Sequence, residues 1–117
     1  MGMRVRAGYM RIGVMEAQQL IATRSPLVLD VRDAQSYARG HIPDAQSASE
    51  TAVYGLLTSQ PKRHPVLIYC YHGNASQTYA QTFVDFGFEE VFSLDGGFEH
   101  WRQVEGAPIA IPVAGGG

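Results

Sequence analysis

The stretch VLIYCYHGNAS, residues 66–76, passes from β-forming residues into a short polar loop that contains a glycine. It predicts a buried strand over residues 66–69 and a helix that begins at Ala75. The only cysteine of the chain, Cys70, follows the strand directly. A lone cysteine at this place is either a small core residue or a nucleophile, and the rest of the chain must decide between the two.

Strands and helices alternate on both sides of this stretch. Upstream, the pattern predicts a helix that begins near Val14 and ends before Ser25-Pro26, a strand over 27–31, a helix over 33–38 that ends at Gly40, a brief strand, and a helix carrying Val53, Leu56 and Leu57. Ser47 with Glu50, or Ser49 alone, could cap this last helix. Downstream, it predicts a strand over 89–94, a turn over 95–97 and a helix over 98–104. Such alternation is typical of an α/β fold, with a parallel sheet covered by helices on both faces.

The helix from Ala75 carries an aromatic stripe before it stops at Gly87. Tyr79, Phe83 and Phe86 recur at helical spacing. We expect this stripe, together with Trp101 of the last helix, to belong to the core.

Length and composition indicate one globular domain. The 117 residues are 45% hydrophobic, with a formal net charge of −2 and nine scattered basic residues. We expect an N-terminal extension over 1–9 that could be flexible, one domain over 10–112, and a flexible glycine-rich tail over 113–117. The scattered charge argues against nucleic acid and membrane surfaces as partners. A single cysteine cannot close an internal disulfide, which favours the cytoplasm, and we expect a monomer.

The position of Cys70 favours an ionised thiol. In parallel sheets, ligands bind beyond the carboxyl ends of the strands, and here a helix N-terminus with unpaired N–H groups follows. Such surroundings lower cysteine pKa values to about 3.5–7.5 from about 8.5. Two or three N–H donors would suffice, since each hydrogen bond to a charged group contributes roughly 1.5–3 kcal/mol. Gly73 lets the backbone curve closely around the sulfur.

Other cysteine chemistries lack their partner residues in this sequence. A phosphatase-like loop needs an arginine six positions after the cysteine, where this chain has Ser76. No second cysteine completes a CxxC pair, and no His/Cys cluster has zinc spacing. We therefore predict no metal site and no cofactor. His72 and Asn74 are polar loop residues that could also satisfy backbone groups.

Three motifs in order resemble those of the rhodanese family, in particular its small bacterial single-domain thiosulfate sulfurtransferases of the GlpE type. They are LVLDVRDAQSYARGHIPDA at 27–45, CYHGNAS at 70–76 and VFSLDGGFEHW at 91–101. The resemblance implies a central parallel sheet of about five strands flanked by helices. It also implies that Cys70 is the catalytic nucleophile, which takes the outer sulfur of thiosulfate as a persulfide and passes it to an acceptor.

The resemblance further assigns roles to the residues around the cysteine. It implies a loop that binds the substrate and persulfide through its backbone N–H groups, formed by Tyr71, His72, Gly73, Asn74, Ala75 and Ser76. It implies supporting roles for Asp30, Arg32, His41, Gly96 and Gly97, the two glycines making a turn beside the site. Many relatives have arginine or a hydroxyl residue where this chain has Ala75, so we expect modest affinity for thiosulfate.

Two main hypotheses follow, with a third less favoured. The first is a sulfurtransferase that moves sulfur from thiosulfate or another sulfane-sulfur donor to cyanide or a thiol, such as glutathione or a thioredoxin-like protein. The second is a sulfur-carrier or docking module that protein partners load with sulfur. The alanine at position 75, where many relatives have arginine or a hydroxyl residue, favours this hypothesis. The third, a Cdc25-like phosphatase or arsenate reductase, would need a longer loop with an arginine.

Overall fold

A five-stranded parallel sheet with the order β1-β5-β4-β2-β3 forms the centre of the computed structural model, which describes residues 8–111. The strands are β1 (Met10–Ile12), β2 (Leu27–Asp30), β3 (Gln46–Ser47), β4 (Val66–Tyr69) and β5 (Val91–Leu94). The helices are α1 (Val14–Arg24), α2 (Ala34–Arg39), α3 (Glu50–Ser59), α4 (Ala75–Asp85) and α5 (Gly97–Trp101). The predicted α/β class and parallel sheet are confirmed.

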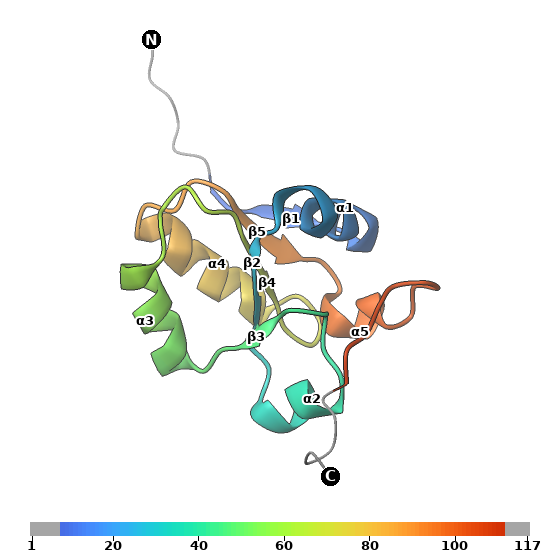
Figure 1. Ribbon diagram of the computed structural model, residues 1–117. Helices are drawn as coiled ribbons and strands as arrows, with labels where there is room; N and C mark the ends of the chain where they lie inside the picture. The colour runs from blue at the N-terminus through green and yellow to red at the C-terminus, as the bar shows by residue number, and fades with distance from the viewer. Residues whose placement is uncertain (1–7, 112–117) are drawn as a thin grey trace.

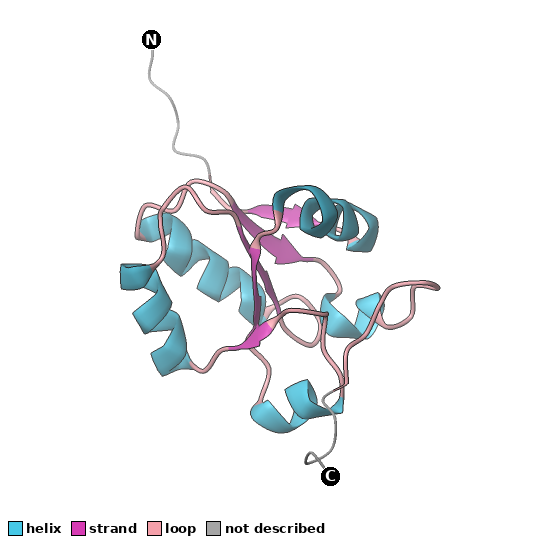
Figure 2. Cartoon of the chain, in the orientation of Figure 1, coloured by secondary structure: helices cyan, strands magenta, loops and turns pink. Residues whose placement is uncertain are grey.

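The helices cover the two faces of the sheet separately. Figure 1 shows α3 and α4 on one side and α1 and α5 on the other, and Figure 2 shows the sheet edge-on between them. Side chains of a strand point alternately to the two faces. Leu27, Leu29, Val66 and Ile68 thus pack with α3 and α4, whereas Val28, Leu67 and Tyr69 pack with α1 and α5. Strands β2 and β4 are buried along their whole length because helices cover both faces of the sheet there.

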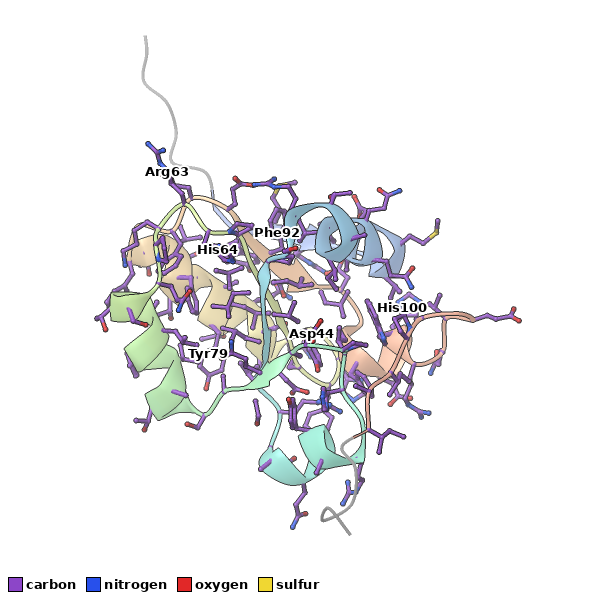
Figure 3. The ribbon with its side chains drawn as sticks, viewed as in Figure 1. Asp44, Arg63, His64, Tyr79, Phe92 and His100 are labelled. Atoms are coloured by element: carbon purple, nitrogen blue, oxygen red, sulfur yellow. The ribbon has the colours of Figure 1, made fainter. Side chains whose placement is uncertain are left out.

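The aromatic stripe of α4 is only partly in the core. Phe83 is fully buried, and Tyr79 is partly buried on the side that α3 and α4 cover (Figure 3). The prediction for Phe86 was wrong, because its side chain is 47% exposed. Phe86 lies after the last turn of α4, and Gly87, at φ +93°, returns the chain toward the sheet. Phe88 then fills the core in its place, edge-on to Phe83 at 4.8 Å.

Some element bounds differ from the sequence expectations. Strand β1 was not predicted; it has three residues, of which only Ile12 is buried, and so short an alternation does not distinguish a strand. Helix α5 ends at Trp101 rather than at residue 104. The N-cap of α3 is Ser49, whose hydroxyl accepts a hydrogen bond from the Ala52 N–H at 3.2 Å.

The predicted tail over 113–117, and residues 1–7 of the predicted N-terminal extension, lie outside the described residues. Tyr9 is partly buried, and its hydroxyl donates a hydrogen bond to the Gln77 side chain at 2.8 Å. Within residues 8–111, no helix has the length and hydropathy needed to cross a membrane.

The carboxyl ends of the strands meet at one edge of the sheet. The chain runs outward from β2 to β3 on one side, and from β4 to β5 on the other. The crevice where the direction reverses is the usual ligand site in such sheets. Cys70 follows β4 and therefore lies beside this reversal.

Helix α5 approaches the chain after β4 so closely that a side chain would not fit. Gly97 has φ +60°, and a Cβ there would meet the Tyr71 carbonyl oxygen and lie 2.5 Å from the Cys70 oxygen. The N–H of Phe98 donates to the Cys70 carbonyl at 2.8 Å, and that of Glu99 to the Tyr71 carbonyl at 3.0 Å. Glycine at position 97 is thus required both by the backbone conformation and by contact.

We expect Gly97→Ala to be markedly destabilising. The left-handed conformation costs about 1–2 kcal/mol for alanine, and the clash with the carbonyls adds about 1–3 kcal/mol. Gly87→Ala is the matched control, because φ is +93° but nothing lies within 4 Å of the new methyl group. Denaturant titration of the two variants and the wild type gives the free energy of unfolding of each. Equal losses for the two variants would mean that the close contact at Gly97 does not constrain the fold.

Candidate functional site

Cys70 lies inside the loop between β4 and α4, with its side chain turned toward the loop backbone. It is a free cysteine with a relative exposure of 4%. Its Sγ accepts hydrogen bonds from the Gly73 N–H at 3.2 Å and the Ser76 N–H at 3.3 Å. The Ser76 hydroxyl lies 3.4 Å from Sγ. The thiol is buried, but polar donors surround it rather than apolar side chains alone.

These donors favour the thiolate over the thiol. Burial raises the pKa of Cys70, whereas hydrogen bonds from the Ser76 hydroxyl and from the N–H groups of Ser76, Gly73 and His72 lower it. The lowering prevails, so the pKa of Cys70 lies below its ordinary value. Gly73 makes this geometry possible, because its φ of +96° turns the loop back over the sulfur.

A buried serine pair continues the polar contacts of the sulfur. The Ser76 and Ser93 hydroxyls lie 2.8 Å apart, and both residues are fully buried. Ser93 was not singled out from the sequence. Its signal is a hydroxyl in an otherwise apolar buried strand, near the carboxyl end and on the face that α4 covers.

Asp30 and Arg32 form a buried ion pair next to the loop. The Arg32 guanidinium donates to both carboxylate oxygens of Asp30, at 3.0 Å to Oδ1 and 2.7 Å to Oδ2, and to the Gly40 carbonyl at 2.7 Å. It also lies over the Phe98 ring, 4.2 Å from the centroid. Arg32 thus connects β2, the end of α2 and α5. Loss of one partner would leave a buried charge, at a cost of about 3–5 kcal/mol.

His41 makes its contacts elsewhere. Its ring stacks on Tyr37 at 3.8 Å, and its Nδ1 lies 2.9 Å from the Tyr37 carbonyl oxygen. Its backbone pairs with Ala110. Among residues 8–111, no hydrogen bond joins His41 to the loop, so it holds α2 to the C-terminal segment rather than contacting Cys70.

Tyr71 connects the loop to the start of α2. Its hydroxyl donates to the carboxylate of Asp33, the N-cap residue of α2, and lies 2.5 Å from the Ser36 hydroxyl. The hydrogen bond from Tyr71 is the largest cause that lowers the pKa of Asp33 to about 2. The sequence did not predict this contact, since nothing in the motif pairs residue 71 with residue 33.

The remaining predicted loop residues face solvent or begin α4. His72 is exposed and lies 6.3 Å from the Tyr71 ring. Asn74 is the N-cap of α4 without a side-chain hydrogen bond, and Ala75 is the exposed first residue of the helix. Gly96 has φ +78° and precedes the close approach of Gly97. The N–H groups of Gly73 and Ser76 lie within 3.3 Å of the sulfur.

The arrangement suits a sulfur nucleophile that forms a small anionic adduct. A thiolate with N–H groups aimed at it can attack a sulfur or carbon electrophile, and the same N–H groups can hold a further negatively charged atom. Within residues 8–111, no group of three His, Cys, Asp or Glu side chains could hold a metal ion.

Sequence relatives agree with this site. Residues 14–104 match the family model of the rhodanese-like domain. The thiosulfate sulfurtransferase GlpE of Coxiella burnetii is 44% identical over 94 residues, which cover 80% of this chain and 88% of that protein. GlpE of Pseudomonas paraeruginosa is 42% identical over 96 residues, covering 82% and 86%.

A solved structure agrees with the fold. The rhodanese-like domain of the Anabaena protein Alr3790 superposes with a TM-score of 0.77 at 23% identity, covering 90% of this chain and 81% of that one. Taken with the match over residues 14–104 and the close sequence relatives, the chain belongs to the rhodanese family.

Proposed function

We propose that this protein is a thiosulfate sulfurtransferase that carries sulfur as a persulfide on Cys70. The observation that carries the proposal is the buried Sγ, which accepts two backbone N–H hydrogen bonds and has a lowered pKa. Sequence identity of 44% to a protein named thiosulfate sulfurtransferase supports the same activity.

The reaction proceeds in two displacements. The Cys70 thiolate attacks the outer sulfur of thiosulfate, an S–S bond forms, and sulfite leaves with the electron pair of the broken bond. Cyanide or the thiolate of an acceptor then attacks that outer sulfur. The electron pair of the Cys70 S–S bond returns to the cysteine as a thiolate. No external oxidant or reductant is needed, because the sulfane sulfur passes on as such.

The loop has a role in both steps. The N–H groups of Gly73 and Ser76 stabilise negative charge on Sγ before the attack and after the transfer. They also favour a negatively charged outer sulfur at the same place. Three further residues support the loop without contacting the sulfur, because they hold β2, α2 and α5 around it: Asp30, Arg32 and Gly97.

Two rival functions have less support. A phosphatase would need an arginine to bind phosphate oxygens, and position 76 holds a buried serine that contacts the sulfur and Ser93. The presence of Ala75 is also compatible with a module that receives its sulfur from protein partners. The experiment with thiosulfate described below distinguishes such a module from a thiosulfate sulfurtransferase.

The single cysteine supports a cytoplasmic location, and we propose a monomer with one domain over residues 10–112.

Incubation with thiosulfate should add one sulfur atom to the wild-type protein and none to Cys70→Ala. The mass of the intact protein measures the gain, since the persulfide is covalent. Added cyanide should then remove the sulfur and yield an equal amount of thiocyanate. If thiosulfate leaves the mass unchanged while an alkylating reagent still modifies Cys70 at neutral pH, the thiolate is present but the small donor is not used. That result would favour the partner-loaded module.

Ser76→Ala should raise the pKa of Cys70, because it removes a hydrogen bond that lowers this pKa. The thiolate would then form only at higher pH, and the midpoint of the alkylation rate should move up by about one pH unit. Thr78→Ala, an exposed hydroxyl on the same helix, is the control and should leave the midpoint unchanged. An unshifted midpoint in Ser76→Ala would exclude the hydroxyl as a source of thiolate stabilisation.

A further inference from the structure

A cavity of about 580 Å³ lies between α2 and α5, beside the Cys70 loop. We call it the α2–α5 cavity. Its walls include Arg39 and Gly40 at the end of α2, Tyr71 of the loop, Phe98 and Arg102 near α5, and Ile109 of the C-terminal segment. The volume falls in the range of about 300–1,000 Å³ that is usual for small-molecule sites.

The cavity shares a wall with the loop that holds the nucleophile. Tyr71 follows Cys70 directly, about 3.8 Å away between Cα atoms. Phe98, which lines the cavity, donates its N–H to the Cys70 carbonyl at 2.8 Å. A molecule in the cavity would therefore contact the residue that follows the nucleophile and the ring of the residue that bonds to the Cys70 carbonyl.

The charges of the cavity leave one cation without a partner. Arg32 is paired with the buried carboxylate of Asp30, and Arg102 contacts Glu99 at 2.9 Å. Arg39 is exposed, lines the same cavity and forms no ion pair within residues 8–111. An arginine at the end of α2 also suits the helix dipole, but the dipole alone does not require a cavity in front of it. An unpaired guanidinium beside a cavity favours a carboxylate, which it binds with two parallel hydrogen bonds.

Besides Ser36 and the Glu99 carboxylate, which pairs with Arg102, the rim carries apolar side chains that are open to solvent. Tyr71, Ile109 and Ile111 all line the cavity and are 43%, 41% and 68% exposed. Exposed apolar side chains gathered beside a cation suit a ligand with both an apolar or peptide-like body and a carboxylate. Thiosulfate and cyanide have no such body, so neither donor nor small acceptor accounts for the cavity.

We propose that the α2–α5 cavity binds the sulfur acceptor, a low-molecular-weight thiol with a carboxylate, and that Arg39 binds this carboxylate. The proposal rests on the sulfurtransferase activity proposed above. The thiolate of the bound acceptor attacks the outer sulfur of the Cys70 persulfide. A new S–S bond forms on the acceptor, the Cys70 S–S bond breaks, and its electron pair returns to Cys70 as a thiolate. The transferred sulfur leaves on the acceptor as a persulfide.

The test compares acceptors that differ in what they can contact. Glutathione has carboxylates, its diethyl ester has none, and cyanide is too small to reach Arg39 while it attacks the sulfur. Each is assayed with thiosulfate on the wild type, Arg39→Gln, Arg39→Lys and Arg63→Gln. Arg63 is the control because it is exposed and precedes β4, at the opposite end of the sheet from Cys70 (Figure 3).

Arg39→Gln should raise KM for glutathione about tenfold with little change in kcat, because a charged contact to the carboxylate is lost. Arg39→Lys should raise the KM for glutathione less than Arg39→Gln does, because lysine keeps the positive charge. The diethyl ester should have a high KM in the wild type and respond little to the change at Arg39. Turnover with cyanide should stay within about twofold for all variants, which also establishes that they fold.

The outcomes separate this inference from the proposed function. Absence of thiocyanate with the wild type would overturn the sulfurtransferase itself, and the acceptor site with it. Normal thiocyanate formation with the same glutathione KM in the wild type and Arg39→Gln would overturn the acceptor site alone. An equal rise in the glutathione KM for Arg63→Gln and Arg39→Gln would also overturn the acceptor site, because the effect would then come from the overall charge of the protein.

Discussion

The site depends on a contact between backbones rather than on a side chain. The first N–H groups of α5 bond to the carbonyls of Cys70 and Tyr71, and this is possible only because Gly97 has no Cβ. These bonds hold the start of the loop against α5, and further along the same loop the N–H groups of Gly73 and Ser76 bond to the sulfur. A helix that follows β5 thus determines what a cysteine after β4 can do.

Much of the fold and part of the site follow from sequence pattern. Strands β2, β4 and β5 are short apolar runs bounded by turn residues, and buried parallel strands have few other forms. Cys70 and Gly73 could be placed because a strand end and a helix start define the loop. The two glycines after β5 indicated a turn, but not that one of them lies against the carbonyl of the nucleophile.

What sequence pattern missed depends on tertiary contacts. Strand β1 has only three residues, Met-Arg-Ile, and one of them is buried, so its apolar alternation is too short to indicate a strand. Phe86 has the spacing of a core residue, but the helix ends before it and Phe88 takes the place. The contacts of Ser93 with Ser76, and of Tyr71 with Asp33, join residues far apart in the chain. A local pattern can single out one member, as the hydroxyl of Ser93 in an apolar strand does, but it does not indicate the partner.

The pairing of β1 has a consequence for how the chain reaches this structure. Met10 of β1 lies opposite Phe92 of β5, so more than two thirds of the chain separates the two partners. On a ribosome, the first strand would leave the exit tunnel long before the strand that it joins. Strands β2 and β4 could pair, with α3 between them, while β1 still has no neighbour. The edge of the sheet therefore closes late, and the loop around Cys70 becomes complete only when α5, which follows β5, has also been synthesised.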